Sequence, residues 1–494
     1  MKAEDGREYK LEKFDRARMQ YLRLSPTRVR TAWGTLEVDR EDDAFFYFRL
    51  YRDISPPPGP SVAEQREKKA DELRQHLPQP LEEVDGLEGV DFGHGLPTSG
   101  QWRNSFEFAD MNEDGFLDLV HGPARKGDRV PKVFLGDGKG NWRLWREASF
   151  PSQTYDYGDV SVGDFNGDHH LDMVLGVHLL GLRALMGDGK GKFTTANEGL
   201  PWRSKAAEPM GFSSQQVQAV TWDDKPKAGF LALSEGPRMP TPGSSPVQGT
   251  EGVRLYRNAS SDPARVEWEW VNESDKSSDL FGEDLQLVPD SKGRGFLVGS
   301  GRMDYRDLVF LGRNKDGWRQ QSLPLPPRTN VWSSAPLRRA GPASFDVVTA
   351  ALSFDAGMTL RLIDLYRMEK TGWTRRTLWF EEKKGQGPVR VATGDLDGNG
   401  LDDIVALGAD GQVWVLLQQP GDSWVSEKSP ELQGQVGCSG AGLRIQDLDA
   451  DGKPEIAISW SGETDLLNDP KACRDSGSLR VWKIHPRSAT TKPQ

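Results

Sequence analysis

The stretch Ala109–Val120 reads ADMNEDGFLDLV, and the rest of the chain is best understood outward from it. Four of its first ten residues are acidic and a fifth is Asn112, after which the sequence turns apolar. This much negative charge beside the start of a buried strand is unfavourable unless a cation lies among the oxygens. The stretch therefore predicts a loop that holds a positive ion and leads into a strand.

The same nine-residue pattern occurs four times. Asp110–Asp118 (DMNEDGFLD), Asp164–Asp172 (DFNGDHHLD), Asp395–Asp403 (DLDGNGLDD) and Asp447–Glu455 (DLDADGKPE) form the first, second, third and fourth loops. Each has oxygen-bearing side chains at positions 1, 3, 5 and 9, and each precedes an apolar run. The candidate metal ligands are Asp110, Asn112, Asp114, Asp118, Asp164, Asn166, Asp168, Asp172, Asp395, Asp397, Asn399, Asp403, Asp447, Asp449, Asp451 and Glu455.

Calcium chemistry explains this spacing. Calcium takes about six to eight oxygen ligands, and a tight loop with ligands at alternate positions turns those oxygens inward. Position 6 needs a positive φ, which glycine adopts readily; Gly115, Gly400 and Gly452 occupy it, and His169 replaces glycine in the second loop. We expect about four structural calcium ions, with the second site the weakest. The alternative is a set of Asx-rich turns without metal.

The spacing of the loops predicts a repeat. Loop starts are 54 residues apart in the first pair and 52 in the second, and 231 residues separate the pairs. Three degenerate units that begin at Thr221, Leu287 and Arg338 fill this gap; they keep the apolar run but few acids, so we expect no calcium there. An aromatic residue after a polar turn recurs with the same period: Trp142, Phe193, Trp268 or Trp270, Trp318, Trp373 and Trp424.

Each unit thus reads as strand, loop, strand, strand, turn and strand. Seven such units over residues 96–487 predict an all-β fold, a seven-bladed β-propeller. A calcium-binding β-roll is the alternative, but its repeat is much shorter. The last unit lacks a fourth strand.

Residues 1–95 are expected to form a small extension with a hairpin at 28–53, a proline-rich linker at 55–60 and a helix at 61–76. One strand of the hairpin is expected to complete the last blade; an independent hairpin is the alternative. Residues 488–494 form a polar tail.

The motifs FADMNEDGFLDLVHG, VGDFNGDHHLDMVLG and TGDLDGNGLDDIVALG resemble the FG-GAP/VCBS repeats of integrin α-chain propellers and bacterial surface proteins. This resemblance implies a calcium-stabilised propeller with its loop sites on the rim of one face. It also implies an extracellular or periplasmic protein that functions in adhesion, recognition or carbohydrate binding.

Charge and composition narrow the function. A net charge of −11 disfavours nucleic acid and anionic membranes as partners. No run approaches the roughly 20 apolar residues of a membrane helix. The polar start MKAEDGREYK is no secretory signal, so the chain is either cytoplasmic or an exported protein whose leader has been removed; weak calcium loops favour the extracellular, periplasmic or outer-surface location.

No catalytic motif is evident, because none of the seven histidines forms a zinc spacing and no GxSxG is present. We therefore expect a non-enzymatic module that binds a protein or glycan. The alternatives are a lyase-like polysaccharide-active enzyme, and a scaffold subunit of an envelope complex assembled through the N-terminal extension.

Three further features carry weaker hypotheses. Cys438 and Cys473 lie near the last repeat and form either one disulfide or two free thiols, and an exported location favours the disulfide. His169 and His170 are more simply exposed loop residues than ligands of a second metal. The Pro/Gly/Ser-rich insertion at 236–251 is a candidate binding edge.

Overall fold

The computed structural model describes the backbone of residues 22–25, 28–31, 34–41 and 46–51. It further describes residues 62–487 except for 125–128, 204–210, 222–226, 237–250, 272–279, 283, 289–294, 300–307, 315–316, 327, 339–344, 356, 383–386, 463–472 and 474–475. Two compact units divide the chain, Met1–Asp71 and Glu72–Gln494. The expected linker at 55–60, the tail at 488–494 and nearly all of the 236–251 insertion lie outside the described residues.

The first unit holds one antiparallel sheet of consecutive strands, β1 (Leu22–Ser25), β2 (Arg28–Thr31), β3 (Gly34–Glu41) and β4 (Phe46–Tyr51). The predicted hairpin at 28–53 is therefore present as β2 to β4. The single described α-helix, α1 (Val62–His76), matches the predicted helix at 61–76 and spans the boundary between the units. No helix among the described residues is long and apolar enough to cross a membrane.

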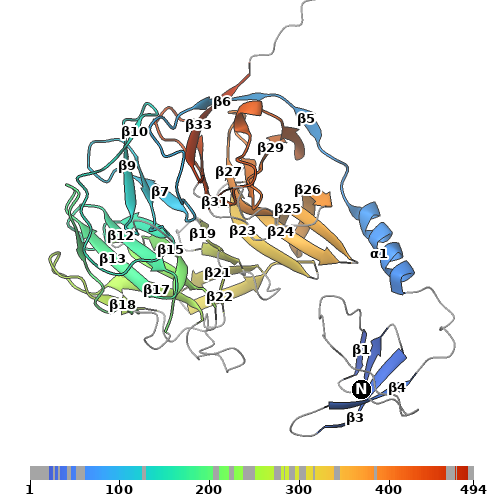
Figure 1. Cartoon of the computed structure of the whole chain (residues 1–494). Coiled ribbons are helices and arrows are strands. Elements are labelled where there is room, and N and C mark those ends of the chain that lie inside the picture. The colour runs from blue at the N-terminus through green and yellow to red at the C-terminus, as the bar shows by residue number, and fades with distance from the viewer. Residues whose placement is uncertain are drawn as a thin grey trace, which may run out of the picture. The chain divides into compact units, whose positions relative to one another are not determined.

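The described residues of the second unit form seven sheets that follow one another along the chain, and the consecutive strands within each sheet pair as an antiparallel meander (Figure 1). The strands of the first to the fourth sheet are β7 (Phe106–Ala109), β8 (Asp118–His121), β9 (Lys132–Gly136), β10 (Trp142–Leu144); β11 (Val160–Gly163), β12 (Asp172–Val177), β13 (Gly181–Gly187), β14 (Phe193–Thr195); β15 (Ser214–Val220), β16 (Gly229–Ser234), β17 (Val253–Asn258), β18 (Trp268–Trp270); β19 (Asp284–Val288), β20 (Gly295–Gly299), β21 (Val309–Asn314), β22 (Gly317–Ser322).

The remaining sheets complete the unit, and two of them take an additional strand from the segment before β7. The strands are β23 (Thr329–Arg338), β24 (Phe345–Asp355), β25 (Met358–Glu369), β26 (Gly372–Glu382) in the fifth sheet; β27 (Pro388–Gly394), β28 (Asp403–Gly408), β29 (Val413–Gln419), β30 (Ser423–Glu427) with β5 (Glu82–Val84) in the sixth; and β31 (Gly440–Gln446), β32 (Glu455–Trp460), β33 (Leu479–Pro486) with β6 (Leu87–Asp91) in the seventh. A short 3₁₀ helix, η1 (Pro430–Leu432), follows β30.

The core lies between neighbouring sheets. Met173 and Leu175 of β12 pack with side chains of the first sheet, whereas Val174 between them packs with the third sheet. A strand that is covered on both faces loses the alternation of apolar and polar residues, and all six residues of β12 are buried. The innermost strand of each sheet contacts that of the next, and β31 of the seventh contacts β7 of the first. Four-stranded meanders stacked in this way are the architecture of a β-propeller.

The fourth strand of the seventh sheet comes from an unexpected segment. We expected a strand of residues 28–53 there, and this is wrong: β6 pairs with β33, with Gly89 opposite Ile484. The runs at 28–53 pair with one another instead. The strand LEGVD was missed because it is short and contains two acids and a glycine. The seven-sheet unit thus includes strands from Glu82 onward, upstream of the boundary expected at residue 96.

Other expectations from the repeat are confirmed. The apolar runs of the three degenerate units form β16, β20 and β24. The landmark aromatics lie in the fourth strands, and Trp142, Phe193, Trp268 and Trp424 are buried there. The loops that precede β16, β20 and β24 lie largely outside the described residues, so their expected lack of calcium stays a prediction.

Cys438 and Cys473 form a disulfide, which confirms the first of the two alternatives. Both residues are buried, and Cys438 precedes β31 while Cys473 lies between β32 and β33. The bridge therefore links the segment before β31 to the connection between β32 and β33.

Candidate metal centre

The four loops share one frame of hydrogen bonds. The carboxylate at position 1 accepts the backbone N–H of position 6 in every loop, at 2.9–3.1 Å. The side chain at position 5 accepts the N–H of position 7 at 2.7–3.0 Å. The oxygen at position 3 accepts the N–H of position 5 at 2.9–3.3 Å. Side-chain oxygens thus turn toward the interior of each loop, as the spacing predicted.

Position 6 adopts the predicted backbone conformation. Its φ is 90° at Gly115, 85° at Gly400 and 84° at Gly452, and His169 adopts 72° in the second loop. A side chain in this region is strained, which supports the expectation that the second loop is the least favourable. Position 4 also has a positive φ in all four loops, including 61° at Glu113 and 60° at Ala450, which the sequence analysis did not predict.

The acid at position 9 acts as a clasp on the backbone. Asp118, Asp172 and Asp403 are fully buried, and one oxygen of each accepts the N–H of position 2 at 2.8–2.9 Å. The other oxygen accepts a backbone N–H from the third strand or its end, at Gly136, Gly187 or Gln418. Sequence reasoning assigned position 9 only to the metal and missed this second role.

Burial changes the acidity of the clasp. Loss of hydration raises the pKa of Asp118, Asp172 and Asp403 to about 7 each, against a usual value near 4, and the neighbouring acids of each loop add to the effect. Ionised together, these side chains repel one another in the absence of a cation. The arrangement therefore favours binding of either protons or a metal ion.

We expect the metal-free protein to lose stability as the pH rises from about 4 to about 7. In this range the folded protein holds protons on the clasp acids that the unfolded chain has already released, so the free energy of unfolding falls as pH rises. Denaturant unfolding of metal-stripped protein across this range measures the slope. Asp403→Asn should make the slope shallower, and an unchanged slope would contradict the assignment.

Two loops bring three acidic side chains close together. Asp395, Asp397 and Asp403 of the third loop offer carboxylate oxygens within 4.8 Å of one another, and Asp447, Asp449 and Glu455 of the fourth do the same. Calcium is bound by oxygen ligands of this kind. The position-5 acid Asp451 lies outside the group of the fourth loop.

The first and second loops differ at position 3, where the residue is Asn112 or Asn166. Each amide donates from Nδ2 to the position-5 acid, Asp114 or Asp168, at 2.8 Å. Within the described residues, neither loop brings three acidic or histidine side chains as close together as the third and fourth loops do. An amide oxygen is also a calcium ligand, so these two loops still offer oxygen ligands at the same positions. They lack three carboxylates that lie close together.

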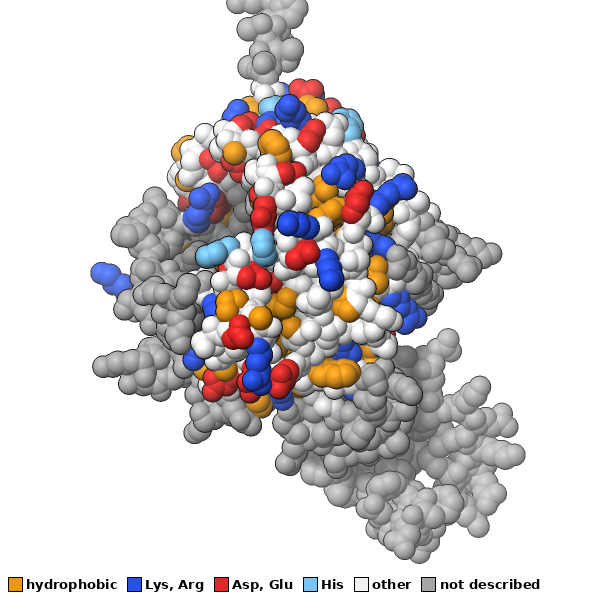
Figure 2. All heavy atoms as spheres, turned by 90° about the vertical axis from the view of Figure 1, so that its left-hand side faces the viewer, with side chains coloured by type: hydrophobic (Ala, Val, Ile, Leu, Met, Phe, Trp, Pro, Cys, Tyr) orange, Lys and Arg blue, Asp and Glu red, His pale blue; other side chains and the backbone are white. Residues whose placement is uncertain are grey.

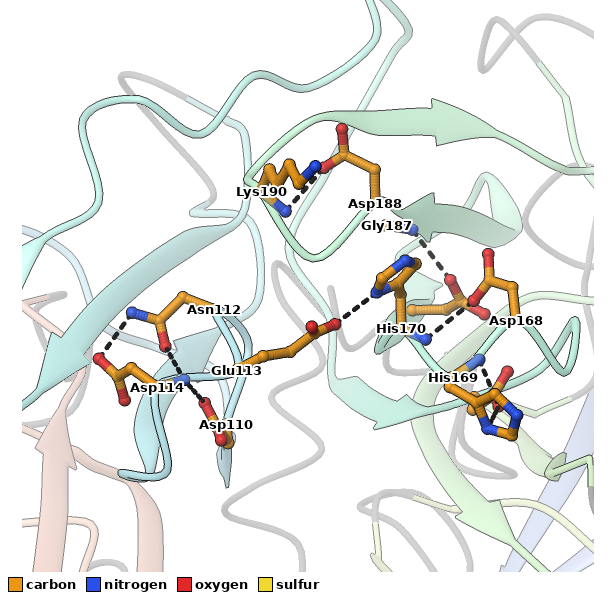
Figure 3. A network of polar contacts seen from close by, with 12 residues as sticks. Asp110, Asn112, Glu113, Asp114, Asp168, His169, His170, Gly187, Asp188 and Lys190 are labelled. Carbon is orange, nitrogen blue, oxygen red and sulfur yellow. Dashed lines mark hydrogen bonds and ion pairs between the residues drawn. The ribbon is translucent and has the colours of Figure 1, made fainter.

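The first and second loops contact each other (Figure 3). Glu113 points from the first loop toward His170 of the second and pairs with its Nδ1. This contact raises the pKa of His170. His169 is 95% exposed, and its Nδ1 lies 3.9 Å from Asp164 Oδ2. The two histidines thus point to different partners, in keeping with loop residues rather than a second metal site.

A groove of 570 Å³ lies beside the second loop. Its lining includes Asp168, Asp188, Glu198 and Arg265. Side chains of both charge signs therefore line it, and Figure 2 shows the same mixture of acidic and basic side chains across the visible face of the molecule. The sequence did not mark this groove, because its residues come from two repeats.

Comparison with known proteins agrees with the repeat. Residues 124–175 and 395–458 match a family model described as an FG-GAP-like repeat, and these regions contain the second, third and fourth loops. No curated protein matches the chain.

Solved structures resemble the chain at low identity. BBS1N in complex with ARL6DN, from a crystal soaked with lead, is 12% identical with a TM-score of 0.46, covering 83% of this chain and 100% of that one. The same complex soaked with mercury is 11% identical with a TM-score of 0.44, covering 83% and 98%. The N-terminal domain of Nup159 is 10% identical with a TM-score of 0.42, covering 82% and 97%. The two matched regions show that this chain contains FG-GAP-like repeats.

Proposed function

We propose that this protein is a calcium-stabilised, seven-bladed propeller that serves as an interaction module for a protein or glycan outside the cytoplasm. The observation that carries the proposal is the third loop, in an FG-GAP-like repeat, where Asp395, Asp397 and Asp403 converge. Calcium bound there would join β27 to β28, since the loop connects these two strands.

The blade count rests on how the sheets pack. Each of the seven sheets contacts the next, and the seventh contacts the first through β31 and β7. Side chains of both sheets share one core, including Ala457 and Val481 from the seventh and Phe106 and Leu119 from the first. The pairing of β6 with β33 joins chain segments from both ends of the propeller in one sheet.

The proposed location outside the cytoplasm rests on the disulfide and on the expected affinity of the loops for calcium. Disulfides persist in oxidising compartments and are rare in the cytosol. Exposed loops of this kind should bind calcium at about 10⁻⁴–10⁻³ M, the range of extracellular modules. Both features favour an extracellular, periplasmic or outer-surface protein.

The ligand surface is proposed at the groove beside the second loop. Concave sites with a few converging polar groups are the usual places for small ligands and chain ends, and this groove combines carboxylates with Arg265 and Lys192. A polysaccharide-active enzyme is the alternative function. A lyase would release unsaturated oligosaccharides from an acidic polysaccharide, whereas an interaction module would retain the intact polymer.

The calcium proposal is tested with Asp397→Ala. We expect this variant to bind one ion fewer than the wild type, and to melt at a lower temperature only when calcium is present. Calorimetric titration counts the ions, and thermal unfolding in millimolar calcium or excess chelator gives the shift. Asp137→Ala is the matched control, because Asp137 is a turn acid outside the loops. A wild type that binds no calcium would overturn the proposal.

A further inference from the structure

The residue opposite the position-9 acid is apolar in three loops and basic in the fourth. In each of the first three loops, the position-9 acid begins the second strand of its sheet, which pairs with the third strand. Extending this antiparallel pairing by one residue places Leu135 opposite Asp118, Met186 opposite Asp172 and Leu417 opposite Asp403. The same geometry in the seventh sheet places Lys483 opposite Glu455. Opposite residues of an antiparallel pair lie on one face and touch. The fourth loop alone among these four therefore faces an ammonium group from its own sheet.

That ammonium lies among the predicted metal ligands. Lys483 Nζ pairs with Asp449, lies 2.7 Å from Asp451 Oδ2 and 3.7 Å from Glu455 Oε1. These are the residues at positions 3, 5 and 9. The lysine side chain is only 15% exposed, as is that of Asp449, and Glu455 is fully buried. The Lys483 ammonium also lies 5.6 Å from the ring centroid of Phe92.

The acids of the fourth loop fit this partner. In the first three loops, positions 3 and 5 combine one acid and one amide, and the amide nitrogen donates to the acid at 2.8–3.1 Å. In the fourth loop both positions are acids, Asp449 and Asp451, which would repel each other. Lys483 supplies the donor that the amide supplies elsewhere, and it contacts both carboxylates.

We propose that the Lys483 ammonium is the built-in cation of the fourth loop, so that this loop closes without calcium. The inference rests on the proposed calcium function of the other loops and narrows it, because it removes one of the four expected ions. The propeller then has a calcium-dependent joint at the third loop and a calcium-independent joint at the fourth, in successive sheets.

Calcium and the ammonium exclude each other at this place. A calcium ion holds its oxygens at about 2.3–2.6 Å, and an ammonium holds them at about 2.7–2.9 Å. Both would require Asp449, Asp451 and Glu455 at once, with two positive charges in contact. Calcium could enter only if Lys483 withdrew from its largely buried position. Because the lysine is covalently attached to the chain, its effective concentration at the site does not depend on dilution.

The test compares calcium stoichiometry in the full chain. Lys483→Met restores the kind of side chain found at Leu135, Met186 and Leu417, and we expect it to bind one calcium more than the wild type. Adding Glu455→Gln to this variant should remove the gained ion. Lys453→Met is the control, because Lys453 belongs to the same loop but is exposed; its stoichiometry should equal that of the wild type.

A second variant tests the proposal even if Lys483→Met fails to fold. Asp451→Asn in the wild-type background should leave the calcium count unchanged, whereas Asp397→Ala should lower it by one. If Asp451→Asn also loses an ion, or if Lys483→Met gains none while Asp397→Ala behaves as expected, the inference on Lys483 is overturned and the calcium function stands. If neither the wild type nor Lys483→Met binds calcium, both fall.

Discussion

Replacing Cys438 and Cys473 together by alanine should lower the free energy of unfolding by about 4 kcal/mol. The disulfide closes a loop with a sequence separation of 35 residues, and the loop-entropy relation gives about this value for a loop of that length. Alanine is preferred to serine because both cysteines are buried, and a buried hydroxyl without a partner would add its own cost. Denaturant unfolding in an oxidising buffer measures the change.

The control for the disulfide is the wild type in reductant. Unfolding under reducing conditions should bring the wild type close to the double variant, while the double variant itself should not respond to reductant. The effect should be equal in calcium and in chelator, because neither cysteine belongs to an acidic loop. A double variant as stable as the oxidised wild type would show that the covalent link contributes little to the seventh sheet.

The repeated loops allowed most of the fold to be predicted. The alternate spacing of acids, the glycine at position 6 and the apolar run after each loop are local features, so a single sequence reveals them. The degenerate units were located by the same apolar run, and β16, β20 and β24 confirm them. Local chemistry was sufficient wherever the signal lay within about ten consecutive residues.

The features that were missed depend on contacts between distant segments. β6 is a weak strand by composition, and it becomes a strand because β33 offers an unpaired edge almost 400 residues later. The second role of Asp172 depends on the N–H of Gly187, which belongs to another strand. Lys483 is unremarkable in the sequence VWKIHP, and its importance comes only from the register that places it opposite Glu455.

The second large effect is expected at a clasp acid: Asp172→Ala should destabilise the protein by about 3 kcal/mol even when calcium is absent. The carboxylate accepts the N–H of Phe165 and of Gly187, both at 2.9 Å in a fully buried place. A buried donor that loses its partner costs about 1–3 kcal/mol, and water does not reach this site to replace the acceptor. Burial makes the carboxylate itself unfavourable, so its removal offsets part of this loss of stability. The expected value therefore lies below the sum of the costs of two unpaired donors.

Asp188→Ala is the matched control. Asp188 also accepts two backbone N–H groups, from Lys190 and Lys192, both at 2.9 Å, but in an exposed turn. Both acids accept two backbone N–H groups, but Asp172 is buried and Asp188 is exposed to water, so the control should cost about 1 kcal/mol or less. Denaturant unfolding of both variants, in calcium and in chelator, separates the two roles of position 9. A loss at Asp172 that occurs only in calcium would mean that the acid acts through the metal, and the clasp would then contribute nothing of its own.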